Sequence, residues 1–211
     1  MKLLGKKAGK TATGARTPAS RTPHPFDELP MRLTRELERA ANLAVMLAQS
    51  RALGTVSAVD FLAAMYLNHW EGLERYWHDA EEIEKYLASV CRVSPQRWHK
   101  WLLEYDAERR EEALQARRKF TLGRKPSRRE TGGDGLGMSR ELESVLRRAG
   151  RISPVRDPEE GRTVPILTSE SVLLAMARDG DSEVGRRLAS TGLDVEKLER
   201  AARDPKRAPL H

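Results

Sequence analysis

SAVDFLAAM at residues 57–65 is matched without a gap by TSESVLLAM at residues 168–176. Each stretch begins with a hydroxyl residue that suits a helix N-cap and continues with an apolar run. Two shorter stretches repeat in the same order: LTRELE (33–38) as MSRELE (138–143), and IEK (83–85) as VEK (195–197). Three repeats in one order indicate a duplicated supersecondary unit, which normally packs against its copy. We therefore expect the function to lie on the paired copies.

Both copies carry the pattern of amphipathic helices. Apolar residues recur at three- and four-residue steps and predict four helices in each copy: near 34–50, 57–68, 73–77 and 83–87, and then near 142–152, 168–178, 182–192 and 194–204. The expected caps are Thr34, Ser57, Thr168 and Asp194, with Gly192 in the left-handed conformation. No segment alternates with the period of a strand, and 153–165, with three prolines, is expected to be a loop. The prediction is an all-α fold of two pseudo-symmetric four-helix repeats.

A long helix and a flexible linker are expected between the copies. Trp98, Trp101, Leu102 and Tyr105 share one face of a helix that begins near Pro95. The composition divides the chain into a disordered basic tail (1–29), the first repeat (30–94), the inserted helix (95–120), a basic Gly-rich linker (121–137), the second repeat (138–205) and a C-terminal tail (206–211). The linker would let the repeats pack within one chain or swap between two chains, and the sequence leaves both arrangements open.

The net charge of +7 belongs to two segments. Residues 1–26 carry +6 and residues 117–129 carry +7, with no acid in either, so the rest of the chain carries −6. These basic residues would suit an anionic partner: Lys6, Lys7, Lys10, Arg117, Arg118, Lys119, Arg124, Lys125, Arg128 and Arg129. The alternatives are a nucleic-acid-associated protein, an acidic protein partner, or a tail and linker that only keep the chain soluble. Few aromatic residues interleave the charges, which disfavours readout by base stacking.

Composition also bears on the compartment. Cys91 is the single cysteine, so no internal disulfide is possible and a reducing, bacterial-type cytoplasm is expected. No apolar run approaches the roughly 18 residues of a membrane-spanning helix, so no membrane partner is expected. An acid-free start containing Thr, Ser and Arg is also compatible with an organelle transit peptide.

The second copy resembles the Clp N-terminal domain. TSESVLLAM (168–176) is followed by Gly185 and by LASTGLD (188–194). In that family the second helix commonly opens Ser/Thr-Glu-His-Leu-Leu-Leu-Ala and the third ends Leu-x-x-x-Gly-Leu-Asp. The match is good over 138–203 and weaker over 32–88, and the duplication is similar to the paired four-helix repeats of that family.

The resemblance implies a helical module that stands at the front of Clp-type unfoldases and receives adaptors and unfolded substrates. No Gly-x-x-x-x-Gly-Lys-Ser/Thr motif occurs in the sequence. We therefore expect a free-standing Clp-N-like protein without the AAA+ ATPase domains. Its partners would be Clp ATPase or protease subunits, adaptors or unfolded proteins.

The resemblance also implies a binding site at the helix starts. Some members bind phosphoarginine there through acidic and hydroxyl groups, and only the second copy retains such groups, in Thr168, Ser169 and Glu170. With Ser57 of the first copy, these are the candidate protein- or peptide-binding residues. The alternative is structural, because hydroxyl residues cap helices and a glutamate in the first turn favours the helix dipole.

Two departures weaken the match at these positions. Val59 stands where the second copy has Glu170, and the histidine of the family is Asp60 in one copy and Ser171 in the other.

Nothing in the sequence indicates catalysis. No serine elbow, Cys–His pair or distinctive carboxylate pair occurs. His69, His78 and His99 each adjoin a tryptophan, but their spacing is not that of a zinc site. We expect no catalytic residue, no metal and no cofactor, and a non-catalytic accessory, adaptor or substrate-recognition protein of Clp-type proteolysis or chaperone machinery.

Overall fold

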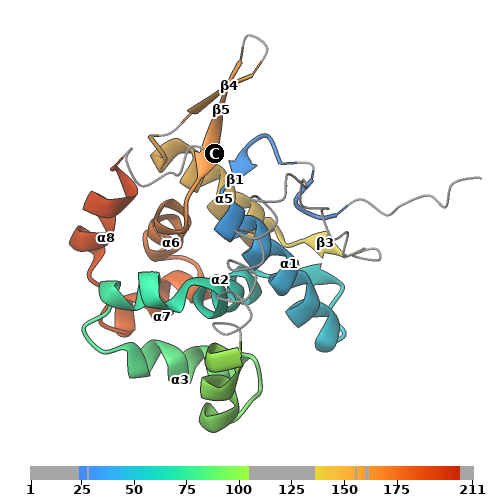
Figure 1. Ribbon diagram of the computed structural model, residues 1–211, viewed down its shortest axis with the longest axis vertical. Helices are drawn as coiled ribbons and strands as arrows, with labels where there is room; N and C mark the ends of the chain where they lie inside the picture. The colour runs from blue at the N-terminus through green and yellow to red at the C-terminus, as the bar shows by residue number, and fades with distance from the viewer. Residues whose placement is uncertain (1–23, 28, 105–135, 155, 160–161, 205–211) are drawn as a thin grey trace, which may run out of the picture.

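The computed structural model describes residues 24–27, 29–104, 136–154, 156–159 and 162–204 (Figure 1). Within these residues the body is mostly helical, as predicted. Its helices are α1 (Arg35–Ser50), α2 (Ala58–Leu73), the 3-10 helix η1 (Glu74–Tyr76), α3 (Ala80–Val90), α5 (Arg140–Ile152), α6 (Ser169–Ala177), α7 (Glu183–Ser190) and α8 (Val195–Ala202), and residues 95–104 are also helical.

Five short strands were not predicted. They are β1 (Arg32–Leu33), β2 (Thr55–Val56), β3 (Gly137–Met138), β4 (Arg156–Glu159) and β5 (Arg162–Leu167). The prediction that no strand is present was therefore wrong. Three of the strands have only two residues, which is too short for a period-two pattern to show.

The second helix of each copy lies at the centre of the body. In α2 every residue from Phe61 to Leu67 is buried, and in α6 every residue from Ser169 to Met176 is buried. Helices buried on all sides read as continuous apolar runs, which explains the two matching stretches of sequence. The buried face of α1 carries the small residues Ala40, Ala44 and Ala48, which let α1 approach α2 closely.

The third helix of the first copy is much shorter than predicted. The helix α2 continues past Asn68 to Leu73, with a kink at His69 (φ −141°, ψ 33°), and only the 3-10 turn η1 follows. The His69 imidazole folds back over Gly72 and fills the space that a Cβ at residue 72 would need. The second copy has the full helix α7 at the corresponding place.

Two parallel pairings join the halves of the chain. The strand before the first helix of each copy pairs with the strand before the second helix of the other copy: β1 with β5, and β3 with β2. Equivalent backbone bonds extend both pairings, because Thr34 N donates to Leu167 O (3.1 Å) and Ser139 N donates to Val56 O (2.9 Å). Neither half is therefore complete without a segment of the other.

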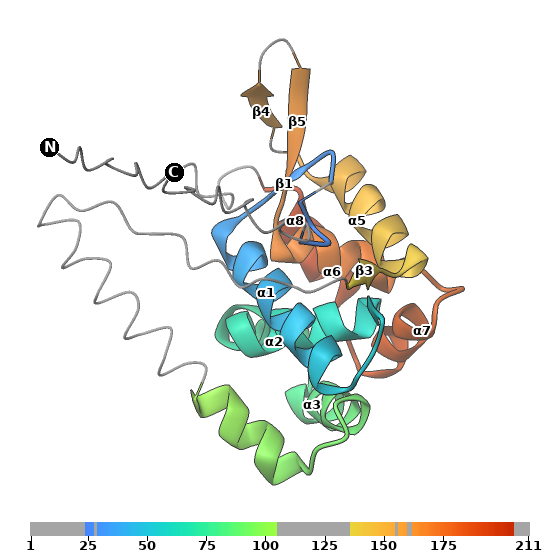
Figure 2. The ribbon, with the colours of Figure 1, turned by 90° about the vertical axis from the view of Figure 1, so that its right-hand side faces the viewer.

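The expected loop at 153–165 contains a hairpin instead. The antiparallel strands β4 and β5 pair from Arg156 with Pro165 to Glu159 with Arg162. The hairpin extends away from the helices in both views of the ribbon (Figures 1 and 2). Prolines at 158 and 165 obscured this pairing in the sequence, since proline lacks a backbone donor.

The expected tail and linker both contribute to the core. Phe26 is buried and stacks on Phe61, with 5.2 Å between ring centroids. At the other boundary, Leu136 is buried and Gly137 belongs to β3. The core thus includes residues that fall within the predicted disordered tail (1–29) and the predicted linker (121–137). The remainder of both segments, the inserted helix beyond 104 and the tail at 206–211 lie outside the described residues.

Candidate functional site

Ser57 has a structural role at the start of α2. Its hydroxyl accepts from Asp60 N (3.2 Å) and donates to Asp60 Oδ2 (2.6 Å), while Ser57 N donates to the same carboxylate (2.9 Å). Asp60 also pairs with Arg51, whose Nη1 donates to Val90 O at the end of α3 (3.1 Å). This network holds α1, α2 and α3 together.

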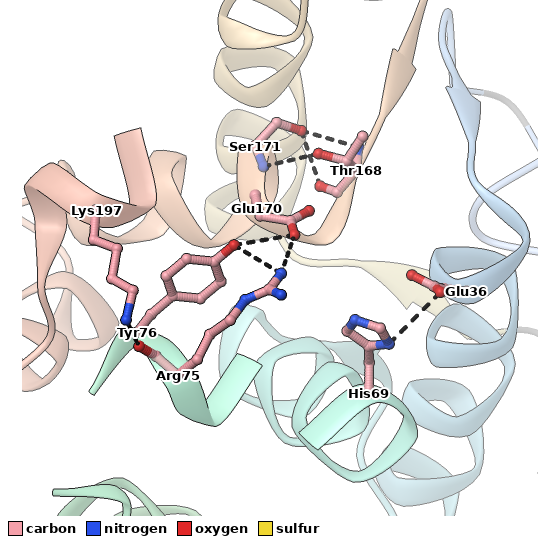
Figure 3. Close-up of polar contacts among 8 residues, drawn as sticks. All are labelled: Glu36, His69, Arg75, Tyr76, Thr168, Glu170, Ser171 and Lys197. Carbon is pink, nitrogen blue, oxygen red and sulfur yellow. Dashed lines mark hydrogen bonds and ion pairs between the residues drawn. The ribbon is translucent and has the colours of Figure 1, made fainter. Parts of the chain in front are cut away.

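Thr168 and Ser169 are buried at the start of α6. The Thr168 hydroxyl accepts from Ser171 N (3.2 Å), and Thr168 N donates to Ser171 Oγ (3.1 Å), which completes a capping box (Figure 3). Ser171 is therefore the capping partner of Thr168. The side chain of Ser169 is also buried, so neither hydroxyl is presented at the surface.

Glu170 joins the two halves of the chain. Its Oε1 accepts from Arg75 Nη2 (3.1 Å) and from the Tyr76 hydroxyl (3.2 Å), and both donors come from η1 (Figure 3). The Arg75 guanidinium lies 4.9 Å from the centre of the Tyr76 ring. Lys197 of α8 completes the group by donating to Arg75 O (2.7 Å). We call Arg75, Tyr76, Glu170 and Lys197 the junction cluster.

The turn beside the junction cluster is fixed by backbone contacts between the halves. Asp194 N donates to Tyr76 O (2.7 Å), and His78 N donates to Gly192 O (3.2 Å). Gly192 has φ +72°, the left-handed conformation predicted for it. The buried Trp77 Nε1 donates to Thr191 Oγ1 (2.9 Å). Because η1 is held at several points, the position of Arg75 is well defined.

A surface hollow of about 380 Å³ adjoins the junction cluster, between η1 and α8. We call it the cationic hollow; it is lined by Arg75, Tyr76, Lys197, Arg200, Ala201 and Asp204. Three of these residues are basic and one is acidic. Tyr76 is only 1% exposed, so Ala201 is the apolar residue that presents surface in the hollow.

The charges near the hollow are set by ion pairs on α8. Glu199 contacts Arg178 (2.6 Å) and Arg203 (2.5 Å), and the hydrogen bond from Arg178 is the main reason that its pKa lies below the usual value. Glu199 does not line the hollow, and its charge is balanced by these two cations. On the other side, burial and then the charge of Glu71 raise the pKa of Glu74.

The predicted basic residues lie outside the described part of the chain. They are Lys6, Lys7, Lys10, Arg117, Arg118, Lys119, Arg124, Lys125, Arg128 and Arg129. The structure therefore does not place them relative to the cluster.

The histidines do not form a metal centre in the part of the chain that the structure describes. No group of three His, Cys, Asp or Glu side chains there lies close enough to hold an ion. His69 Nδ1 instead lies 3.6 Å from Glu36 Oε1 (Figure 3). No helix among these residues is long and apolar enough to cross a membrane.

The structure thus brings together residues that the sequence did not connect. Glu170 was a candidate, but Arg75 was not, because 95 residues separate the two. Tyr76 falls in the helix predicted near 73–77, and nothing in the sequence marked it as a site residue. Lys197 belongs to the third repeated stretch, and its regular spacing from Arg200 and Ala201 was the available signal for a common face on α8.

Comparisons with known proteins leave the family open. No family model matches the sequence, and a search among curated proteins found no match.

Proposed function

We propose that this chain is a non-catalytic protein- or peptide-binding module built from two Clp-N-like repeats related by pseudo-twofold symmetry. It would act in the cytoplasm as an accessory, adaptor or substrate-recognition protein of Clp-type proteolysis or chaperone machinery. Its partners would be a Clp ATPase or protease subunit, an adaptor or an unfolded protein.

One observation carries this proposal: corresponding strands of the two halves pair reciprocally, β1 with β5 and β3 with β2. Together with the repeated sequence stretches, the reciprocal pairing supports two copies of one unit. The Clp connection itself rests on the sequence resemblance.

The junction cluster is the proposed centre of the binding surface, because both halves contribute to it. Glu170 is only 8% exposed, and its carboxylate already accepts from Arg75 and Tyr76. A ligand guanidinium would have to displace Arg75 to reach it. Glu170 therefore contributes mainly by holding Arg75 at the surface, where 40% of the Arg75 side chain is exposed.

Affinity capture tests the proposal. The tagged full chain is incubated with nuclease-treated lysate of its source at moderate salt, and bound proteins are identified by mass spectrometry. We expect Clp ATPase or protease subunits to be recovered, and to be reduced with Glu170→Ala. The conservative variant Glu170→Gln, which can still accept both hydrogen bonds, should retain more binding.

The control variant is Arg140→Ala, an exposed residue at the start of α5. Each variant is checked for folding by circular dichroism before capture. The proposal is contradicted if folded wild-type protein recovers no Clp component, and the role of the cluster is contradicted if folded Glu170→Ala captures as well as wild type.

The runner-up is a nucleic-acid-associated protein, favoured by the two acid-free basic segments. A chain that lacks residues 1–22, which keeps the buried Phe26, and is recoded at 117–129 separates the two functions. Nucleic-acid binding should vanish in this variant, whereas protein binding by the repeats should persist.

A further inference from the structure

The cationic hollow is distinct from the helix-start residues that the sequence singled out. Its walls come from both halves of the chain, with Arg75 on η1 and with Lys197 and Arg200 on α8. A concave surface with clustered basic groups raises the local potential for an anion above that of a flat surface.

Arg75 is positioned before any ligand arrives. Its guanidinium is stacked on the Tyr76 ring and bonded to Glu170 through Nη2. Its side-chain hydrogen bonds to Tyr76 and Glu170 both come from Nη2, and a guanidinium has five N–H donors. A preorganised guanidinium loses little side-chain entropy when it binds an oxyanion.

Lys197 and Arg200 stand on the same side of α8 and are both exposed. Lys197 uses one donor for Arg75 O, and an ammonium group has three. The Arg200 Nε donates to Glu196 O at 3.4 Å, which leaves its Nη groups outside that bond. Both residues line the hollow together with Arg75.

We propose that the cationic hollow binds an anionic oxygen group, a phosphate or a carboxylate, carried on a peptide. That the carrier is a peptide rests on the proposed binding function, whereas the anion site itself does not. Ala201, which is partly exposed in the wall, provides apolar surface for the carbon atoms that carry the anion. Asp204 in the wall and the exposed Glu196 nearby disfavour the continuous phosphate backbone of a nucleic acid.

The test is a titration of the full chain at constant ionic strength, followed by amide NMR so that binding is resolved by site. The probes are inorganic phosphate, a phosphoserine peptide, the same peptide with glutamate, the same peptide with serine, and an RNA oligonucleotide. We expect the amides of 75–76 and 197–204 to shift saturably with the phosphorylated and glutamate peptides, and not with the serine peptide.

The variant is Lys197→Gln combined with Arg200→Gln, and the matched control is Lys85→Gln combined with Arg140→Gln, which removes two exposed cations elsewhere. Loss of two charge-assisted contacts should weaken anion binding about tenfold or more, with the control unchanged. If the Lys197/Arg200 variant and the Lys85/Arg140 control bind the anionic peptides with equal affinity, the cationic hollow is not the anion-binding site.

The remaining outcomes separate the possible sources of the anion. Shifts with inorganic phosphate but with neither anionic peptide would overturn the peptide carrier. If RNA binds more strongly than either anionic peptide, and this binding depends on Lys197 and Arg200, the proposed peptide ligand is wrong and a nucleic acid takes its place. A failed Clp capture together with a positive titration would reject the Clp proposal and support the anion site.

Discussion

Asp60 has two structural tasks at once. It is 1% exposed, it completes the capping box of Ser57, and it pairs with Arg51. The Arg51 guanidinium in turn caps the end of α3 through Val90 O. Removing the carboxylate would leave a largely buried cation without its partner.

Replacing Asp60 by alanine should therefore destabilise the protein by about 3–5 kcal/mol, because a broken buried ion pair leaves an uncompensated charge. The matched control is Asp194→Ala, which removes a partly exposed cap of α8 and should cost about 1 kcal/mol. Urea unfolding followed by circular dichroism measures both. Similar losses in the two variants would show that the Asp60–Arg51 pair contributes little.

Asp179 makes the free energy of unfolding depend on pH in the acidic range. Its hydrogen bond from Arg148 is the main cause that holds its pKa below the usual value, and the Arg148 charge adds to the effect. A pKa that is lower in the folded state gives stability that is complete above the unfolded pKa, about 3.9, and is lost as the pH falls through the folded value.

Asp179→Asn should lower the free energy of unfolding by about 1–3 kcal/mol at pH 7. The difference from wild type should shrink as the pH falls below about 4, because the wild-type carboxylate then becomes protonated. Equilibrium unfolding between pH 7 and pH 3 measures this difference. The control is Asp181→Asn in the same turn, whose free energy of unfolding should differ little from that of wild type at any pH. If Asp179→Asn lowers the free energy of unfolding equally at pH 7 and pH 3, the Asp179 carboxylate is not the source of the pH dependence.

At this scale the sequence predicted local features well. Ser57, Thr168 and Asp194 each accept the backbone bond expected of a cap, since capping depends on residues only three positions away. Thr34 stands at the N-cap position of α1 as predicted, but its side chain makes no capping hydrogen bond. Glu170 was located, but its contact with Arg75 depends on how the halves pack. No local pattern contains that information.

At the scale of elements, α7 approaches the end of α6 very closely. A Cβ at Gly185 would overlap the carbonyl oxygen of Asp179 and lie 2.9 Å from Met176 O. The absence of a side chain at residue 185 thus sets the spacing of the two helices.

Gly185→Ala should destabilise the protein by about 1–3 kcal/mol, because backbone atoms cannot yield as a flexible side chain can. The control is Gly180→Ala in the preceding turn, where nothing lies within 4 Å of the added Cβ. This change should alter stability by no more than about 1 kcal/mol, in either direction. The midpoints of thermal unfolding of the two variants are compared with that of wild type. Equal shifts of the midpoint in the two variants would contradict the close packing of α7 at Gly185.

Element prediction failed where tertiary contacts decided the result. The spacing of Leu73, Tyr76 and Trp77 suits a helix, but α2 extends into this segment and only η1 remains. Strands of two residues form because a partner strand is present. Their own composition could not show them.

At the scale of the whole molecule, the two halves should unfold together. The four tryptophans lie between residues 70 and 101, so fluorescence reports on the first half and its neighbouring helix. Circular dichroism reports on all helices. The Trp77–Thr191 bond and the strand pairings couple these regions.

We therefore expect Gly185→Ala, a change in the second half, to lower the fluorescence midpoint of urea unfolding as much as the circular dichroism midpoint. Gly180→Ala serves again as the control and should move neither midpoint far. A fluorescence transition that stays at the wild-type position would show that the halves unfold independently.

The reciprocal pairing of β1 with β5 also has a consequence for synthesis. During translation, β1 leaves the ribosome long before β5 exists, and α2 emerges without α5 and α6 to cover it. The nascent first half must therefore wait with apolar surface exposed, a state that attracts chaperones and other nascent chains. The native contacts can close only after β5 and α6 have left the ribosome, so the first half cannot complete its fold while it is being synthesised alone.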